Sequence, residues 1–304
     1  MMGLKKLRVS AVKGAITAAL LGTTAVAAPI DLNTPEGAIA ANRKIQCSTE
    51  DNKPVLYTWE GSVFSRRMGE PDKRMFGTVG MNIRACVTVD GGDKGTGYRL
   101  VTREILLYLD PQTGEALETW DNPWTGTTVN VLHVANDPVN QRPSFPYDDE
   151  GNPRARWFAR NQGDSWFMTV PVPLFYHNEL GGEYQAYVGG AYHATELFNF
   201  MGDLESLTSD QTDTADVKVG WVRISDWLPW MEMQGREGTI YIHAAGQKVD
   251  SFEDMPDVMK RYIMEKEPTY VAPPPGDDDR PNETSWTYFK KKIEGGRLPR
   301  GGHN

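Results

Sequence analysis

The chain has 304 residues, with 41 acidic and 32 basic side chains, a formal net charge of −9 and two cysteines. This length is sufficient for one large domain or two small ones. An acidic surface repels phosphate backbones and anionic lipid headgroups, so we expect neither nucleic acid nor a membrane surface as a partner.

Residues 1–27 have the pattern of a secretion signal. A basic segment precedes an apolar run over residues 14–26, which is too short to span a bilayer. Ala25-Val26-Ala27 is typical of a signal-peptidase site, with Ala28 as the new N-terminus. Cleavage would leave 28 basic against 41 acidic side chains, a balance of −13, in a periplasmic or secreted protein. The alternative is an uncleaved anchor.

Cys47 and Cys86 are the only cysteines of the chain. In an oxidising compartment an even pair is a disulfide candidate, and the bridge would close a loop of about forty residues. Two separate buried thiols are the alternative. Neither cysteine has a neighbour at C-x-x-C spacing, so the sequence predicts no zinc or redox motif.

Apolar residues recur with a period of two over most of the chain, which predicts strands. Residues 34–43 and 251–267 instead have helix-start signals and predict two helices. The predicted strands cover residues 55–66, 75–89, 98–109, 115–120, 127–134, 154–160, 164–176 and 183–200, with two more inside 217–248.

Strands that follow one another without intervening helices predict an antiparallel, mainly β protein. We expect a closed or nearly closed barrel of the lipocalin-like kind with two short peripheral helices, because closure removes edge strands. A two-sheet sandwich is the alternative. The expected organisation is a signal peptide at 1–27, one β-barrel-like domain at 28–275 and a flexible C-terminal tail at 276–304.

Residues 217–248 contain the densest group of recognition-type side chains. Period-two alternation places Trp221 and Arg223 on one face of the first strand, and Tyr241 and His243 on one face of the second. If these faces coincide, they form a pocket with aromatic walls and a few polar groups. Arg223 would orient a carboxylate or carbonyl, and His243 would be the acid or base. In the alternative, this face is an outer surface.

The loop between these strands is about twelve residues long and rich in apolar side chains. Trp227, Trp230 and Met231 lie in it, and a loop this apolar is expected to be ordered. It is either a lid over a ligand or a plug in one end of the barrel. Trp227, Trp230 and Met231 are therefore candidate ligand contacts, together with Trp221 and Tyr241.

Three further candidates lie in a tight loop, and a fourth lies in a strand. Trp120, Asn122 and Trp124 belong to the loop; a structural turn held by the Asn122 side chain is the alternative. His193 lies three residues before Glu196, so on a flat strand the two point to opposite faces. No standard catalytic motif is present, and the sequence predicts neither a metal site nor a cofactor.

Three segments of the sequence resemble an uncharacterised family. They read W-x-N-P-x-T-G at 120–126, W-V-R-I-S-x-W-L-P-W-M-x-M at 221–233 and R-x-G-x-I-Y-x-H-A-A-G-x-K at 236–248. Together they resemble domain of unknown function 1838, a bacterial family whose members are often exported. The resemblance extends over about residues 32–275 and implies that the aromatic loops belong to a shared design. It implies no activity, cofactor or catalytic residue.

Two functional hypotheses follow. The first is a cofactor-independent enzyme, an isomerase, lyase or hydrolase, that acts on a partly apolar, oxygenated small molecule. The second is a non-catalytic, lipocalin-like binding or carrier protein that uses the same pocket. A scaffold that binds another protein through its aromatic loop is a third alternative.

Overall fold

The computed structural model describes residues 29–177 and 191–295. The predicted signal segment at 1–27 and part of the predicted strand at 183–200 lie outside the described residues. Nine strands form one antiparallel sheet, and each pairs with its neighbours in the order β6-β3-β2-β1-β11-β10-β9-β8-β7. Their bounds are β1 Val55–Arg66, β2 Lys73–Asp90, β3 Thr96–Leu109, β6 Val134–Asn136, β7 Arg160–Gln162, β8 Ser165–His177, β9 Ala191–Asp203, β10 Val217–Ser225 and β11 Thr239–Val249.

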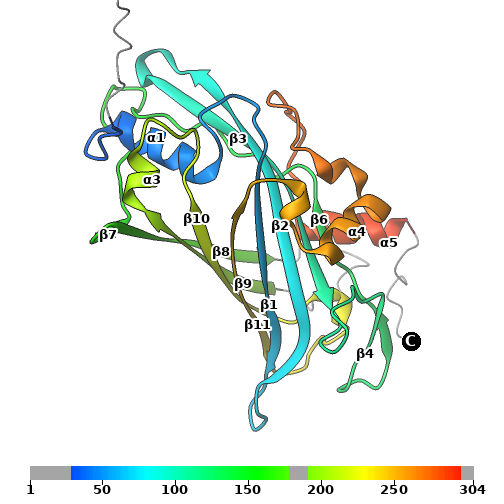
Figure 1. Ribbon diagram of the computed structural model, residues 1–304. Coiled ribbons are helices and arrows are strands. Elements are labelled where there is room, and N and C mark those ends of the chain that lie inside the picture. Colours follow the sequence, from blue (N-terminus) through cyan, green and yellow to red (C-terminus); the bar gives the residue numbers. More distant parts are fainter. Residues whose placement is uncertain (1–28, 178–190, 296–304) are drawn as a thin grey trace, which may run out of the picture.

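The remaining elements pack around this sheet. Two short strands, β4 (Thr119–Asp121) and β5 (Thr128–Asn130), form a separate hairpin. Figure 1 shows helices α1 (Pro35–Gln46) and α3 (Leu204–Thr208) near one end of the long strands, with α4 (Asp257–Lys266) and α5 (Ser285–Glu294) beside β2 and β6. No helix in the described ranges is long and apolar enough to cross a membrane.

The predicted mainly β, antiparallel class is confirmed. A closed ring is not seen among the described strands, because the order of the sheet ends at β6 on one side and β7 on the other. The alternative of a two-sheet sandwich is wrong, since nine of the eleven described strands belong to one sheet. The predicted helix at 251–267 is interrupted at Pro256, which lies between a short 3-10 turn at Phe252–Asp254 and α4.

The sheet has a core on each of its faces. On the outer face of β2 and β3, residues such as Met81 and Ile105 pack against Met259 and Ile263 of α4. The inner face holds a larger aromatic cluster that includes Trp59, Tyr108 and Trp221. Strand β3 is therefore covered on both sides, as its two apolar faces indicate. The inner cluster surrounds the candidate site.

The C-terminal segment differs from the expected flexible tail. Residues 285–294 form α5, which begins at a Thr284 N-cap and buries Trp286, Phe289 and Ile293 in the inner cluster. Tyr288 on the same helix packs toward the outer cluster. The helix thus completes the wall of the domain beside β6.

Candidate functional site

A cavity of about 120 Å³ lies on the inner face of the sheet. Side chains from β1, β2, β3, β9 and β10 line it. Residues 228–230 of the long loop between β10 and β11, residues 132–134 at the start of β6, and α5 contribute the other sides. Six Trp and Phe side chains contribute to its wall: Trp59, Phe198, Trp221, Trp230, Trp286 and Phe289. A ligand in this space would contact rings on several sides.

Glu104 is the acidic group on the β3 side of the cavity. Its cross-strand partners are Asn82 on β2 and Asn136 on β6. Asn136 Nδ2 donates to Oε1 at 2.8 Å, and Asn82 Nδ2 donates to Oε2 at 3.4 Å. Burial, opposed in part by these bonds and reinforced by repulsion from Glu196, raises the pKa of Glu104 above its usual value.

A chain of hydrogen bonds fixes the orientation of Asn82. Arg84 donates to Asn82 Oδ1, which turns the amide nitrogen toward Glu104, and Arg84 Nη1 donates to Gln46 Oε1 at 2.5 Å. Gln46 is the last residue of α1 and precedes Cys47. The α1 end therefore takes part in positioning the cavity carboxyl.

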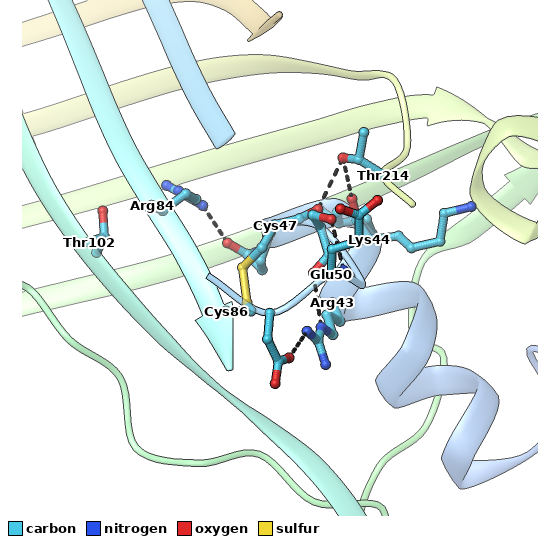
Figure 2. Close-up of a disulfide and its surroundings, with 12 residues drawn as sticks. Arg43, Lys44, Cys47, Glu50, Arg84, Cys86, Thr102 and Thr214 are labelled. Atoms are coloured by element: carbon cyan, nitrogen blue, oxygen red, sulfur yellow. Dashed lines mark hydrogen bonds and ion pairs between the residues drawn. A yellow bond between two sulfur atoms is a disulfide. The ribbon is translucent and has the colours of Figure 1, made fainter. Parts of the chain in front are cut away.

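The predicted pair of cysteines forms a disulfide next to this chain. Cys47 and Cys86 are bonded, with their Cα atoms 5.8 Å apart, so the alternative of separate thiols is wrong. Figure 2 shows the bridge between the end of α1 and β2, with Arg84 two residues before Cys86 on the same strand. The bridge thus anchors α1 where Gln46 meets Arg84.

Arg223 is the cationic group in the cavity lining. It lies directly across from Glu196 in the pairing of β10 with β9 and forms an ion pair with it. Arg223 Nη2 also donates to the Tyr192 hydroxyl at 3.2 Å. Burial disfavours the charged guanidinium, but Tyr192 and Glu196 outweigh it and hold the pKa of Arg223 above its ordinary value.

Several N–H donors around the cavity have no acceptor within the described part of the chain. They are Arg223 Nε and the indole nitrogens of Trp59 and Trp221, whose side chains are 8% and 5% exposed. Unpaired buried donors are uncommon and costly. The Trp59 ring lies over Gly80, where a Cβ atom would come within 2.2 Å of it. The absence of a side chain at Gly80 therefore lets this tryptophan form the cavity wall.

His133 is a neutral wall residue. Its Nδ1 accepts the backbone N–H of Tyr108 at 3.1 Å. Burial lowers the pKa of His133 to about 4, despite an opposing hydrogen bond with the Leu117 backbone. At neutral pH the ring is therefore uncharged, and it holds β3 to the segment that precedes β6.

Three of the predicted site residues line the cavity: Arg223, Trp221 and Trp230. The predicted Trp120, Asn122 and Trp124 instead pack against the long loop, and Trp227 and Met231 belong to that loop without lining the cavity. Asn122 Nδ2 donates to the Met231 carbonyl at 2.8 Å, and its Oδ1 accepts from the backbone N–H of Trp124 at 2.9 Å, so the structural-turn alternative describes it. Trp124 packs on Trp227 with ring centroids 5.2 Å apart.

The expectation that Arg223 and His243 share one face is wrong. Residues paired across an antiparallel sheet share a face. Arg223 is paired with Ile242, whereas His243 is paired with Val222, so the two side chains lie on opposite faces. His243 is exposed on the outer face, where it stacks on Phe64 with ring centroids 5.5 Å apart.

Two further candidates lie on the same outer face. Tyr241 stacks on Phe64 with ring centroids 4.9 Å apart. His193 Nδ1 forms a hydrogen bond with Asp226 Oδ2 at 3.0 Å. Its exposed side chain lies on the face opposite to Tyr192 and Glu196. The sequence predicts this placement of His193 and Glu196 on opposite faces. Neither His193 nor Tyr241 lines the cavity.

Sequence reasoning missed most of the polar wall. Glu104, Tyr108, Tyr192 and His133 were not singled out, although Glu104 is the one acid in the apolar second half of β3. That isolated acid, and the spacing of Trp286 and Phe289 on one helix face, are the signals that could have found this part of the site.

The fold and site define a class: an antiparallel β protein with an aromatic cavity lined in part by largely buried charged groups. The chain belongs to the family described as protein of unknown function DUF1838, whose model matches residues 52–293. The match includes α5, beyond the expected limit near residue 275. A search of curated proteins finds no relative of the chain.

Proposed function

We propose that the protein binds a small, neutral, partly apolar molecule that carries a carbonyl or hydroxyl oxygen. The observation that carries the proposal is the gathering of three largely buried charged residues, Arg223, Glu196 and Glu104, around one aromatic cavity. Burying charged groups costs free energy, and such groups in a concave site are typical of ligand recognition.

The charges favour a neutral ligand. The guanidinium of Arg223 is already neutralised by Glu196, and Glu104 is a second carboxyl in the lining. A ligand carboxylate would therefore meet two glutamates, and the described lining of the cavity has no second cation to balance it. A carbonyl oxygen can instead accept from one of the five guanidinium N–H donors, of which Glu196 and Tyr192 use only two.

The volume favours a ligand of about one ring. An apolar cavity of about 150 Å³ in another protein holds benzene, and this one has about 120 Å³. Cyclohexanone combines a ring of that size with one carbonyl oxygen and is a suitable probe.

Titration of ¹⁵N-labelled protein with cyclohexanone tests the proposal. The indole N–H signals of Trp59, Trp221 and Trp230 should shift, because these rings line the cavity. The Trp227 signal is an internal control, since its N–H is bonded to the Arg236 carbonyl at 3.3 Å outside the cavity. Cyclohexanecarboxylate should shift these signals much less.

A pair of variants locates the binding. Leu106→Phe adds a ring inside the cavity and is expected to weaken cyclohexanone binding at least tenfold. Ile224→Phe adds the same ring at a position 49% exposed on the outer face and should leave binding unchanged. Equal effects of the two variants, or shifts at Trp227 alone, would contradict the proposal.

The remaining features support the same picture. The sheet, with the long loop and α5 across the cavity, would function as a nearly closed barrel, in which the loop is a fixed wall and not a mobile lid. Export through the segment 1–27 would supply the oxidising compartment that favours the Cys47–Cys86 bridge. A carrier without chemistry and an enzyme would both use this cavity.

A further inference from the structure

The two cavity carboxyls have different partners. Glu196 is held by the guanidinium of Arg223, which occupies its oxygen and neutralises its charge. Glu104 receives only amide N–H groups, from Asn82 and Asn136, and no cation bonds to it within the described residues. A pair of carboxyls in such different surroundings is typical of sites where one group transfers protons and the other stays fixed.

Glu104 is also held in place. Its neighbour Asn82 is oriented through Arg84 and Gln46, as described above, and Asn136 Nδ2 holds the other carboxyl oxygen. The raised pKa makes the ionised form a stronger base than an ordinary glutamate. Two charged side chains, Arg84 and Glu196, act electrostatically on this carboxyl. The cavity lining also contains charged Arg223 and the titratable side chains of Tyr108, Tyr192 and His133.

We propose that Glu104 is a catalytic base that moves a proton between carbon atoms of a small ketone. This inference rests on the proposed function, because the ketone must first occupy the cavity. The substrate class is a ring ketone with a carbon–carbon double bond two bonds from the carbonyl carbon, and the reaction is an isomerisation that needs no cofactor.

The step balances within the substrate and one carboxyl. The Glu104 carboxylate takes a proton from the carbon between the carbonyl and the double bond. The released electron pair forms a carbon–carbon double bond, and the carbonyl π pair moves onto oxygen to give a dienolate. The Glu104 carboxyl then returns the proton to the far end of the dienolate. The carbonyl re-forms, and the product is the conjugated ketone.

Arg223 and Tyr192 are the groups placed to stabilise the dienolate oxygen. Both line the same cavity as Glu104, and this cavity has a volume of about 120 Å³. A cation that is already desolvated and fixed by Glu196 stabilises developing negative charge without having to reorganise.

Conversion of cyclohex-3-enone to cyclohex-2-enone, followed by ultraviolet absorbance, tests the inference with the full chain. Wild-type protein should accelerate the conversion, and Glu104→Gln should lower kcat at least about 100-fold. Glu60→Gln, at an exposed carboxyl on the outer face of β1, should leave the rate unchanged. Glu104→Asp, which retracts the carboxylate by one bond, should give an intermediate rate.

Binding is measured on the same samples through the cyclohexanone shifts of Trp59 and Trp221. Loss of turnover in Glu104→Gln with these shifts retained supports the inference. Wild-type protein that binds cyclohexanone but does not isomerise cyclohex-3-enone overturns it and leaves the proposed function intact. Turnover by Glu104→Gln at the wild-type rate also overturns it. If the glutamine variant does not fold, turnover by Glu104→Asp at the wild-type rate overturns the inference in its place. Absence of both binding and turnover overturns the proposed function as well.

Discussion

Glu104 and Arg223 come from strands far apart in the sheet, yet both side chains lie on its inner face. Each is held by a partner directly across from it on a neighbouring strand, Asn82 for Glu104 and Glu196 for Arg223. The register of the strands, more than any local motif, therefore assembles the polar part of the cavity. Because Glu104 and Arg223 have different partners, we expect a substitution at one of them to leave the position of the other unchanged.

His133 gives the protein a specific dependence of stability on pH. Its pKa falls from the ordinary 6.5 in the unfolded chain to about 4 in the folded protein. Above pH 6.5 both states are neutral and the stabilising contribution is complete. As pH falls from 6.5 towards 4, the unfolded chain takes up the proton first, and stability decreases by up to roughly 3 kcal/mol.

Urea denaturation at pH 7.5 and pH 4.5 measures this effect. His133→Asn retains an acceptor for the Tyr108 N–H but cannot titrate, so its stability should decrease less over this range than that of the wild type. His243→Asn removes an exposed histidine and is the matched control. Its stability should decrease between the two pH values as much as that of the wild type. The same decrease in His133→Asn as in the wild type would show that His133 is not the buried neutral group.

At the residue scale, the sequence identified part of the cavity. Trp221, Arg223 and Trp230 stood out because they are close together in a short stretch. Glu104 gave no such signal, since one acid among apolar residues has no characteristic spacing. His243 was placed on the wrong face because alternation fixes faces within one strand, whereas the relation between strands depends on register.

At the element scale, α1 and β2 are joined at the point where they support Glu104. The disulfide closes a loop with a sequence separation of 39 residues, and loops of this length contribute roughly 3–4 kcal/mol to stability. It also holds Gln46 where it bonds Arg84. Loss of the bridge should therefore lower stability and loosen the hydrogen-bond chain to Asn82.

Protein recovered from its own cells tests the bridge and export together. Its intact mass should correspond to a chain beginning at Ala28, and reduction should add two hydrogen atoms. Reduction should also lower the free energy of unfolding by roughly 3–4 kcal/mol, whereas a Cys47→Ala/Cys86→Ala variant should be insensitive to reductant. A full-length chain, or two free thiols in the untreated protein, would contradict the expectation.

The regular elements followed from the sequence more fully than the site did. Residues 55–66 were predicted as a strand and form β1 with the same bounds. Residues 127–134 were predicted as one strand, but the chain changes partner there, from β4 in the small hairpin to β3 in the main sheet. Hydropathy does not indicate a change of partner. The hydropathy pattern also did not predict α5 as an ordered helix. This helix is only ten residues long, and its apolar side chains are stabilised by packing in the cavity wall.

At the scale of the whole molecule, one nine-stranded antiparallel sheet surrounds an aromatic interior, and its described strands do not form a closed ring. The long loop and α5 supply the walls that the strands do not. The family match runs from β1 into α5 as one unit, which agrees with a cavity built from both ends of the domain. The central claim is that this cavity holds a neutral, oxygenated ring.

A crystal structure of the wild-type protein grown with cyclohexanone tests this claim most directly. The expected result is one ring among Trp59, Trp221 and Trp286, with its carbonyl oxygen within about 3.2 Å of an Arg223 nitrogen or the Tyr192 hydroxyl. A cavity that contains only water, with cyclohexanone absent or bound on the outer face beside Phe64 and His243, would contradict it.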